Sequence, residues 1–243
     1  DSISRVLRHI LTVEPDNAAA RLQLVSYAWS REDRKTVIDL CGAARQYNPD
    51  EMAFYYYQGM AYYIDDDYDN ALSAFQNGID VITEKSEPAI VSDFYSVMGE
   101  LLYKKGRKEE AYAAYDSCLQ WKDDNIGCLN NYAYYLSMDG RELEKAERMS
   151  YRTIEADPEN ANNLDTYAWI LFLQGRTAEA KIYIDQALKH DEDASAVILE
   201  HAGDIHAVSG DLEMALELWN KAVVKAPDNS KLKRKIKQKK YLK

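Results

Sequence analysis

Residues 196–229 read AVILEHAGDIHAVSGDLEMALELWNKAVVKAPDN, and this stretch decides the fold. It describes a first helix with the small residue Gly203 in its middle, a tight turn at Gly210, and a second helix that opens on Ala215. Glycine tolerates the left-handed backbone that such a turn needs. Pro227 ends the second helix, and the polar pair after it caps the next one. The stretch therefore predicts a compact unit of two helices.

The same unit recurs along the chain, because three series of residues share one phase. The residues that open the second helices are spaced by 34, 40, 35, 34 and 35 positions: Val37, Ala71, Ala111, Ala146, Ala180 and Ala215. The turn glycines precede the last four of these: Gly106, Gly140, Gly175 and Gly210. The small residues inside the first helices are Gly59, Gly99, Ala133, Ala168 and Gly203. A mid-helix glycine costs about 1 kcal/mol relative to alanine, so we expect a neighbouring helix to approach closely there.

These series resemble the tetratricopeptide repeat. The family pattern places large, small and large residues on the first helix, then Ala, an aromatic residue, a small residue and Pro on the second. The matching residues of three units are Tyr55, Gly59, Tyr62, Ala71, Phe75 and Gly78; Tyr95, Gly99, Leu102, Ala111, Tyr115 and Cys118; and Leu199, Gly203, His206, Ala215, Trp219, Ala222 and Pro227. The resemblance implies an all-α fold, a right-handed superhelical solenoid of antiparallel helix pairs.

The expected organisation follows from the phase. The six repeats cover residues 18–51, 52–85, 92–125, 126–160, 161–195 and 196–229, with a short insertion at 86–91. Residues 1–17 are expected to be the second helix of a truncated repeat, with Leu7 and Ile10 on its inner face, so the natural protein would extend further upstream. Residues 230–243 are expected to form a basic capping helix, since a solenoid end needs a polar outer face.

Charge is distributed unevenly. The net charge is −11, yet residues 230–243 carry eight basic residues and no acidic one. An acidic body repels nucleic acid and anionic membranes, so we expect partners with basic or neutral surfaces and no nucleic acid. The basic tail could contact an anionic partner, fold back on the acidic body, or only solubilise the chain end. No apolar stretch is long enough to span a membrane.

In the family, the first helices line a concave wall, and this placement implies a binding groove. The residues that we expect to form it are Tyr56, Tyr57, Tyr63, Glu100, Tyr103, Asn130, Asn131, Tyr134, Asp165, Trp169, Phe172, Glu200, His201 and Asp204. Aromatic side chains are typical binding anchors, and acidic groups between them favour a ligand with Lys or Arg. The two adjacent amides could bond the backbone of an extended peptide. Some of these aromatic residues could instead only fill the solenoid.

No pattern in the sequence indicates chemistry. Glycine-rich phosphate loops, nucleophile elbows and zinc-protease motifs are missing, so we expect neither an enzyme nor a cofactor. Cys41, Cys118 and Cys128 form no C-x-x-C pair, and His201 and His206 point to different helix faces, so no metal site is expected. The family's carboxylate clamp needs a lysine that these repeats lack, which argues against binding of chaperone tails.

Residues 129–222 are similar to a narrower group, the bacterial cell-envelope tetratricopeptide lipoproteins. The similarity rests on runs such as Leu129 to Tyr134 and Leu164 to Trp169, and it implies an adaptor in the envelope, with a possible lipid anchor upstream of residue 1. We therefore expect a protein-interaction scaffold or adaptor that binds a protein or peptide. A glycan-binding envelope protein, a regulatory domain of a larger protein, and a cytoplasmic location remain as alternatives.

Overall fold

The computed structural model describes residues 2–243, and every regular element in that range is an α-helix. The chain divides into two compact units: residues up to Asn125 form unit 1, and Ile126–Lys243 form unit 2. The helices of unit 1 are α1 (Ser2–Val13), α2 (Ala18–Ser30), α3 (Arg34–Tyr47), α4 (Met52–Ile64), α5 (Tyr68–Ile79), α6 (Pro88–Lys104) and α7 (Lys108–Trp121). Those of unit 2 are α8 (Ile126–Met138), α9 (Leu143–Ala156), α10 (Ala161–Leu173), α11 (Thr177–His190), α12 (Ala196–Val208), α13 (Leu212–Lys225) and α14 (Ser230–Gln238).

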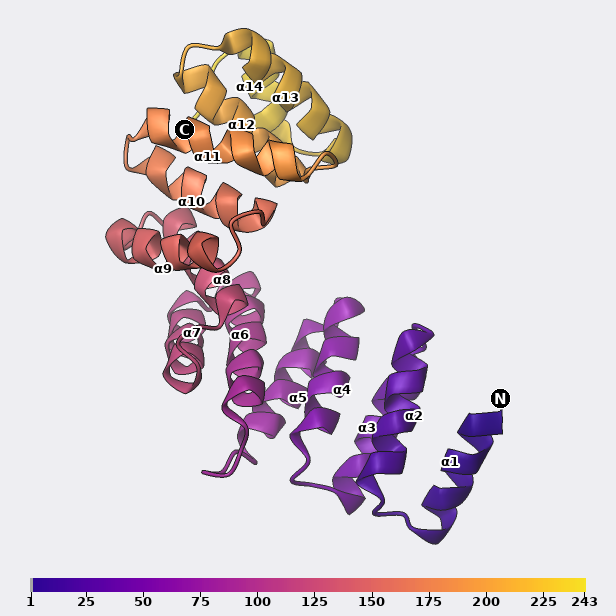
Figure 1. The fold of residues 1–243 in the computed structure, drawn as a ribbon. Coiled ribbons are helices and arrows are strands. Elements are labelled where there is room, and N and C mark those ends of the chain that lie inside the picture. Colours follow the sequence, from indigo (N-terminus) through magenta and orange to yellow (C-terminus); the bar gives the residue numbers. More distant parts are fainter. Residues whose placement is uncertain (1) are drawn as a thin grey trace. The chain divides into compact units, whose positions relative to one another are not determined.

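Within each unit, consecutive helices pack in pairs (Figure 1). Each expected repeat range holds one such pair, with short turns between its two helices. The long helix α6 begins at Pro88, inside the segment 86–91 that we expected to be a short insertion before the repeat 92–125. Proline is well suited to this first helical position, where its missing N–H has no intrahelical partner. Residues 88–91 therefore form the first turn of α6.

The turn glycines adopt the backbone expected of them. Their φ angles are +76° at Gly106, +63° at Gly140, +79° at Gly175 and +90° at Gly210. Two earlier turns place acidic residues in the same left-handed conformation, Glu32 at φ 57° and Asp66 at φ 58°. Glu32 and Asp66 lie two residues before the first residues of α3 and α5, as Gly175 lies before α11, so the turn is the same one without its glycine. The expectation that these helices open on Val37 and Ala71 was wrong, because each is the fourth residue of its helix.

The helices that follow the prolines are capped by polar side chains. Asn17, Asn160 and Asn229 accept hydrogen bonds from backbone N–H groups of the first turns of α2, α10 and α14. At α4 the second residue of the polar pair after Pro49, Glu51, accepts from the Ala53 N–H. In each case the side chain satisfies a donor that the helix leaves without a partner.

Glycines inside first helices lie directly against aromatic rings of second helices. A Cβ on Gly59 would approach Phe75 to 2.7 Å, and one on Gly203 would approach Trp219 to 2.4 Å. Gly99 has the same relation to Tyr115, also at 2.7 Å. All three rings are fully buried. The close helix approach expected at these glycines is confirmed.

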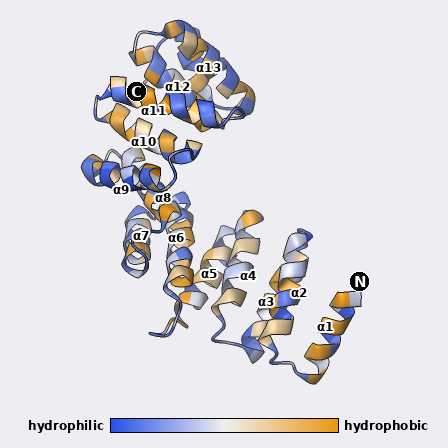
Figure 2. Cartoon of the chain, in the orientation of Figure 1, coloured by the Kyte–Doolittle hydropathy of each residue, from blue (hydrophilic) through white to orange (hydrophobic). Residues whose placement is uncertain are grey.

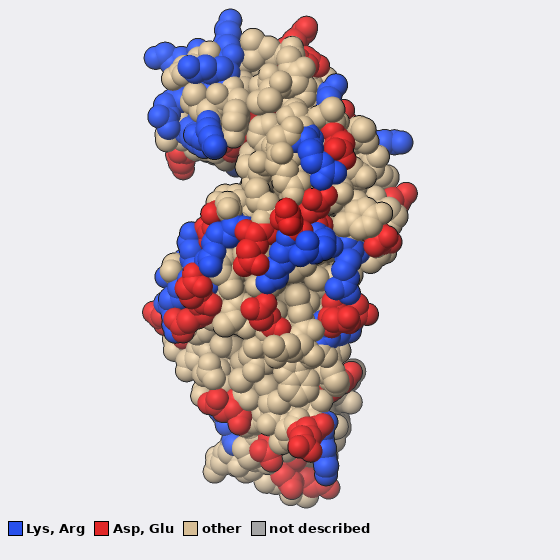
Figure 3. All heavy atoms as spheres, turned by 90° about the vertical axis from the view of Figure 1, so that its left-hand side faces the viewer, with Lys and Arg blue, Asp and Glu red and all other residues tan. Residues whose placement is uncertain are grey.

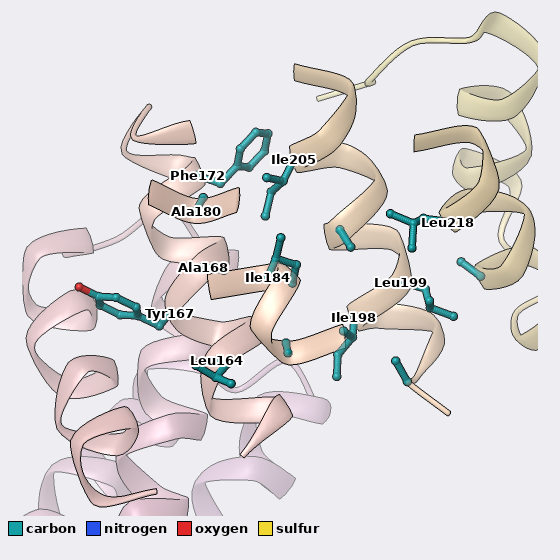
Figure 4. Packing of buried hydrophobic residues seen from close by; sticks show 14 of the residues in the cluster. Leu164, Tyr167, Ala168, Phe172, Ala180, Ile184, Ile198, Leu199, Ile205 and Leu218 are labelled. Atoms are coloured by element: carbon teal, nitrogen blue, oxygen red, sulfur yellow. The ribbon is translucent and has the colours of Figure 1, made fainter. Parts of the chain in front are cut away.

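Aliphatic side chains continue this packing in unit 2, where one cluster joins α10 to α13 (Figure 4). Ala168 of α10 and Ile184 of α11 belong to it, and both are fully buried. Hydrophobic and hydrophilic residues share each helix, as an element with one buried face requires (Figure 2). Leu232 of α14 is buried in the same cluster, and Ile236 packs against it. At the other chain end, Leu7 of α1 is buried, with Ile10 beside it.

The packing yields a stability prediction. Gly59→Ala forces a methyl group into the buried Phe75 ring, so we expect the free energy of unfolding to fall by about 1–3 kcal/mol. Gly42→Ala is the matched control on α3, since its Cβ would meet only the Gln58 side-chain nitrogen at 3.4 Å. The control should be neutral or more stable because alanine favours the helix. Urea unfolding followed by circular dichroism measures both, and equal stabilities would contradict the packing argument.

Candidate functional site

The first helices of unit 2 form a cavity of about 330 Å³ that is lined mainly by polar side chains. The lining residues come from three helices: α8, α10, and α12 with its N-cap Ser195. The lining residues are Asn130, Asn131, Tyr134, Asn162, Asp165, Thr166, Ser195, Val197 and Ile198. The side-chain oxygen of Asn130 is buried and has no hydrogen-bond partner within the protein. The cavity therefore offers amide and hydroxyl groups to a ligand with donors of its own.

A second cavity of about 270 Å³ shares Tyr134 and Val197 with the first. The Asp165–His201 pair joins the two cavities, because Asp165 lines the first and His201 the second. Asp165 Oδ1 lies 2.8 Å from His201 Nδ1, and both side chains are buried. The imidazole stacks on the Trp169 indole, with ring centroids 4.0 Å apart and an interplanar angle of 14°. Asp165 and His201 are therefore bonded to each other, and His201 covers one face of the Trp169 ring.

Lys235 of helix α14 lines the second cavity with a buried side chain. Its ammonium group donates to Glu200 Oε1 at 2.6 Å and to Asp204 Oδ2 at 2.7 Å, although its side chain is only 2% exposed. Asp204 also accepts from the Trp219 indole N–H at 3.0 Å. Burial raises the pKa of the Asp204 carboxyl, and the nearby lysine charge opposes that rise. Glu200 and Asp204, expected to face a ligand, are therefore committed to an internal ion pair.

The last residues of the chain also line this cavity. Tyr241 lies edge-on to Phe172, with ring centroids 5.4 Å apart, and contributes to the cavity wall. Phe172 itself is 8% exposed and packs in the core of unit 2. Within residues 230–243, Lys235 and Tyr241 thus fold back onto the preceding helices. The other seven basic residues of this segment are exposed. Lys and Arg side chains gather at the upper end of the face in Figure 3, where α14 lies in Figure 1.

In unit 1 the expected groove residues separate into two groups. Tyr63 donates to Glu100 at 2.7 Å and accepts from Lys104 at 2.6 Å, while Tyr103 lies under the Lys108 ammonium group. Burial raises the pKa of the Tyr63 hydroxyl, so this tyrosine stays neutral. The other group is Tyr56 and Tyr57, which line a cavity of about 180 Å³.

Four of the expected residues are brought together in the amide-lined cavity: Asn130, Asn131, Tyr134 and Asp165. Sequence reasoning missed several lining residues, including Asn162, Val197 and Tyr241. The signal for Asn162 and Val197 was available, since each occupies the second position of its repeat, which the family places on the concave wall. Nothing in the pattern separated Lys235 from the seven exposed basic residues of the tail.

Residues 2–243 contain no group of three or more His, Cys, Asp or Glu side chains placed to hold a metal ion. In the same range, no helix has the length and hydrophobicity to cross a bilayer. Burial raises the pKa of Cys41 to about 12, so this thiol is protonated and unreactive at neutral pH.

Comparisons with known proteins agree with the repeat fold described above. The family model described as "Tetratricopeptide repeat" matches residues 40–82. The solved structure of the APC/C hetero-tetramer Cut9–Hcn1 superposes with a TM-score of 0.78 at 11% identity. That match covers 98% of this chain and 46% of the other, so this chain spans about half its length. A search of curated protein sequences finds no significant match.

Two further structures are matched over most of both chains. PilW, described as a widely conserved type IV pilus biogenesis factor, has a TM-score of 0.70 at 17% identity, covering 88% of this chain and 96% of that one. YrrB, described as a tetratricopeptide protein with an unusual peptide-binding site, has a TM-score of 0.63 at 15% identity, covering 81% and 97%. The predicted all-α solenoid class and the resemblance to tetratricopeptide-repeat proteins are confirmed.

The Lys235 ion pairs yield a second stability prediction. Lys235→Met leaves Asp204 buried without its cation, so we expect a loss of about 3 kcal/mol of unfolding free energy at neutral pH. The folded-state pKa of Asp204 is already raised above 3.8, and losing Lys235 raises it further. The gap between variant and parent should therefore widen as pH rises from about 4 towards 7, because ionisation then opposes folding.

Urea unfolding at several pH values measures this gap. The double variant Lys235→Met with Asp204→Asn removes the uncompensated charge and should recover part of the loss. A single variant as stable as the parent at neutral pH would show that the buried ion pairs contribute nothing.

Proposed function

We propose that the protein is a non-enzymatic scaffold or adaptor that binds an extended peptide segment of a partner protein in the amide-lined cavity of unit 2. One observation carries the proposal: the buried side-chain oxygen of Asn130 has no partner within the protein. A buried acceptor without a partner costs free energy, and a peptide N–H would satisfy it. Asn131 and Asn162 beside it supply further donors and acceptors for a peptide backbone.

The tetratricopeptide-repeat fold itself indicates a protein-interaction scaffold. The peptide-binding site named for YrrB supports the choice of a peptide as ligand. The charge preference in unit 2 differs from our initial expectation of an acidic wall, because Lys235 offsets Glu200 and Asp204. In the amide-lined cavity the Asp165 carboxylate is paired with His201, so a partner of neutral character suits this cavity. Nucleic acid does not suit a chain of net charge −11.

A glycan is the weaker alternative for unit 2. Sugars stack on open aromatic faces, but His201 covers one face of Trp169. For the location, the pilus biogenesis role named for PilW supports the cell envelope. A cytoplasmic location and a role as the regulatory part of a larger protein are the alternatives to this proposal.

The proposed peptide site can be tested with a displayed library of random dodecapeptides, selected on the protein and then synthesised with a fluorescent label. Asn130→Ala removes an acceptor that has no internal partner, so stability should change little. Affinity for the selected peptides should fall about three- to tenfold, as the loss of one backbone hydrogen bond implies. Fluorescence polarisation measures the change.

Asn220→Ala on the exposed face of α13 is the matched control, since its amide bonds only the Leu216 carbonyl of its own helix. Peptides that bind the Asn130→Ala protein as tightly as the parent would refute the assignment of the cavity. A tryptophan fluorescence titration with oligosaccharides covers the alternative, and a saturable response there would favour a glycan.

A further inference from the structure

The small cavity of unit 1 has a corner of two tyrosine rings beside a carboxylate. Tyr56 and Tyr57 lie with ring centroids 6.2 Å apart at an interplanar angle of 80°. Ala53 of the same helix, and Ile90 and Asp93 of α6, complete the lining. The volume of about 180 Å³ is below the range typical of small-molecule sites, roughly 300–1,000 Å³, and suits a single side chain.

The two rings are held firmly in place from behind. Tyr56 packs against Phe75 and Phe94, with ring centroids 6.1 Å and 5.6 Å away, and Tyr57 packs edge-on to Trp29 at 5.5 Å. Both tyrosines remain partly exposed on the side of the cavity. A fixed pair of aromatic walls loses little conformational entropy when a ligand enters, which is the property of a binding anchor.

The carboxylate of Asp93 is also positioned by its neighbours. The amide of Asn125 donates to Asp93 Oδ1 at 3.0 Å and to the Ser92 hydroxyl at 2.9 Å. Asp93 is exposed, and no Lys or Arg within residues 2–243 pairs with it. Burial, and then the charge of Asp93, raise the pKa of the Tyr56 hydroxyl, so Tyr56 stays neutral and its ring lies within the field of the carboxylate.

We propose that the cavity formed by Tyr56, Tyr57 and Asp93 binds the cationic side chain of a Lys or Arg residue of a partner peptide. The tyrosine faces attract a cation through their ring quadrupoles, and the carboxylate supplies the opposite charge. An aliphatic side chain would leave the Asp93 carboxylate without a counter-ion, and an acidic one would be repelled by it. The proposal deepens the proposed function, since it names the charge that a bound peptide must carry at unit 1.

The surface beside this cavity is also negatively charged. A neighbouring cavity shares Ile90 with the first and is lined by three carboxylates, those of Asp50, Glu51 and Glu87, against the single cation Lys85. Excess negative charge beside a cation site speeds the encounter with a basic peptide and disfavours acidic ones. Unit 1 therefore differs from unit 2, where Lys231 and Lys235 balance the carboxylates of Glu200 and Asp204 in the second cavity.

The test uses the full chain and four acetylated, amidated pentapeptides, each with two glycines on either side of a central Arg, Lys, Gln or norleucine. Two-dimensional NMR at low salt gives dissociation constants from the shifts of backbone resonances. The Arg and Lys peptides should bind at least fivefold more tightly than the Gln and norleucine peptides. Asp93→Asn should reduce this preference to less than twofold.

Asp39→Asn on the exposed side of α3 is the matched control, because it changes the net charge equally and lies outside the cavity. Tyr57→Phe retains the ring and should retain the preference, whereas Tyr57→Leu should lose it. The proposal is overturned if the Gln peptide binds as tightly as the Arg peptide, or if Asp93→Asn leaves the preference unchanged. In that case, dodecapeptide binding that still depends on Asn130 would leave the proposed function intact.

Discussion

The rest of the structure depends on the packing contact between the two helices of each repeat. The residue inside the first helix and the residue that faces it sixteen positions later vary in opposite senses. Glycine stands opposite an aromatic ring at Gly59 and Phe75 and at Gly203 and Trp219, and Val25 shares its cluster with the small Cys41. Because protein interiors are close-packed, the summed volume must stay nearly constant, so each repeat solves the same packing problem with a different pair.

The first helices meet the second helices on one side only, so their other sides can line cavities. Along α8, α10 and α12, the side that does not meet a second helix carries amides, a carboxylate and hydroxyls around one cavity. The charged side chains on these helices also pair with one another. Lys235 binds Glu200 and Asp204, whereas Asp93 of unit 1 has no such cation, so one repeat plan produces a compensated surface in one unit and an uncompensated one in the other.

Much of the fold could be predicted from the sequence, because the repeat is written in residues whose geometry is local. Gly175 and Gly210 mark left-handed turns, and Asn17 and Asn160 mark helix starts. The site was harder. A repeat position indicates which wall a side chain faces, but Asp204 and Glu200 meet Lys235 more than thirty positions later, and such pairing depends on tertiary packing that periodicity does not encode.

The burial of Lys235 has one more consequence, which concerns helix α14. A capping helix usually serves only to shield the last apolar face from water. Here α14 also carries the counter-ion for carboxylates on the wall of the preceding repeat. Displacement of α14 would remove both Lys231 and Lys235 from the lining of this cavity and leave the Glu200 and Asp204 carboxylates there, so the position of α14 sets the charge of the cavity.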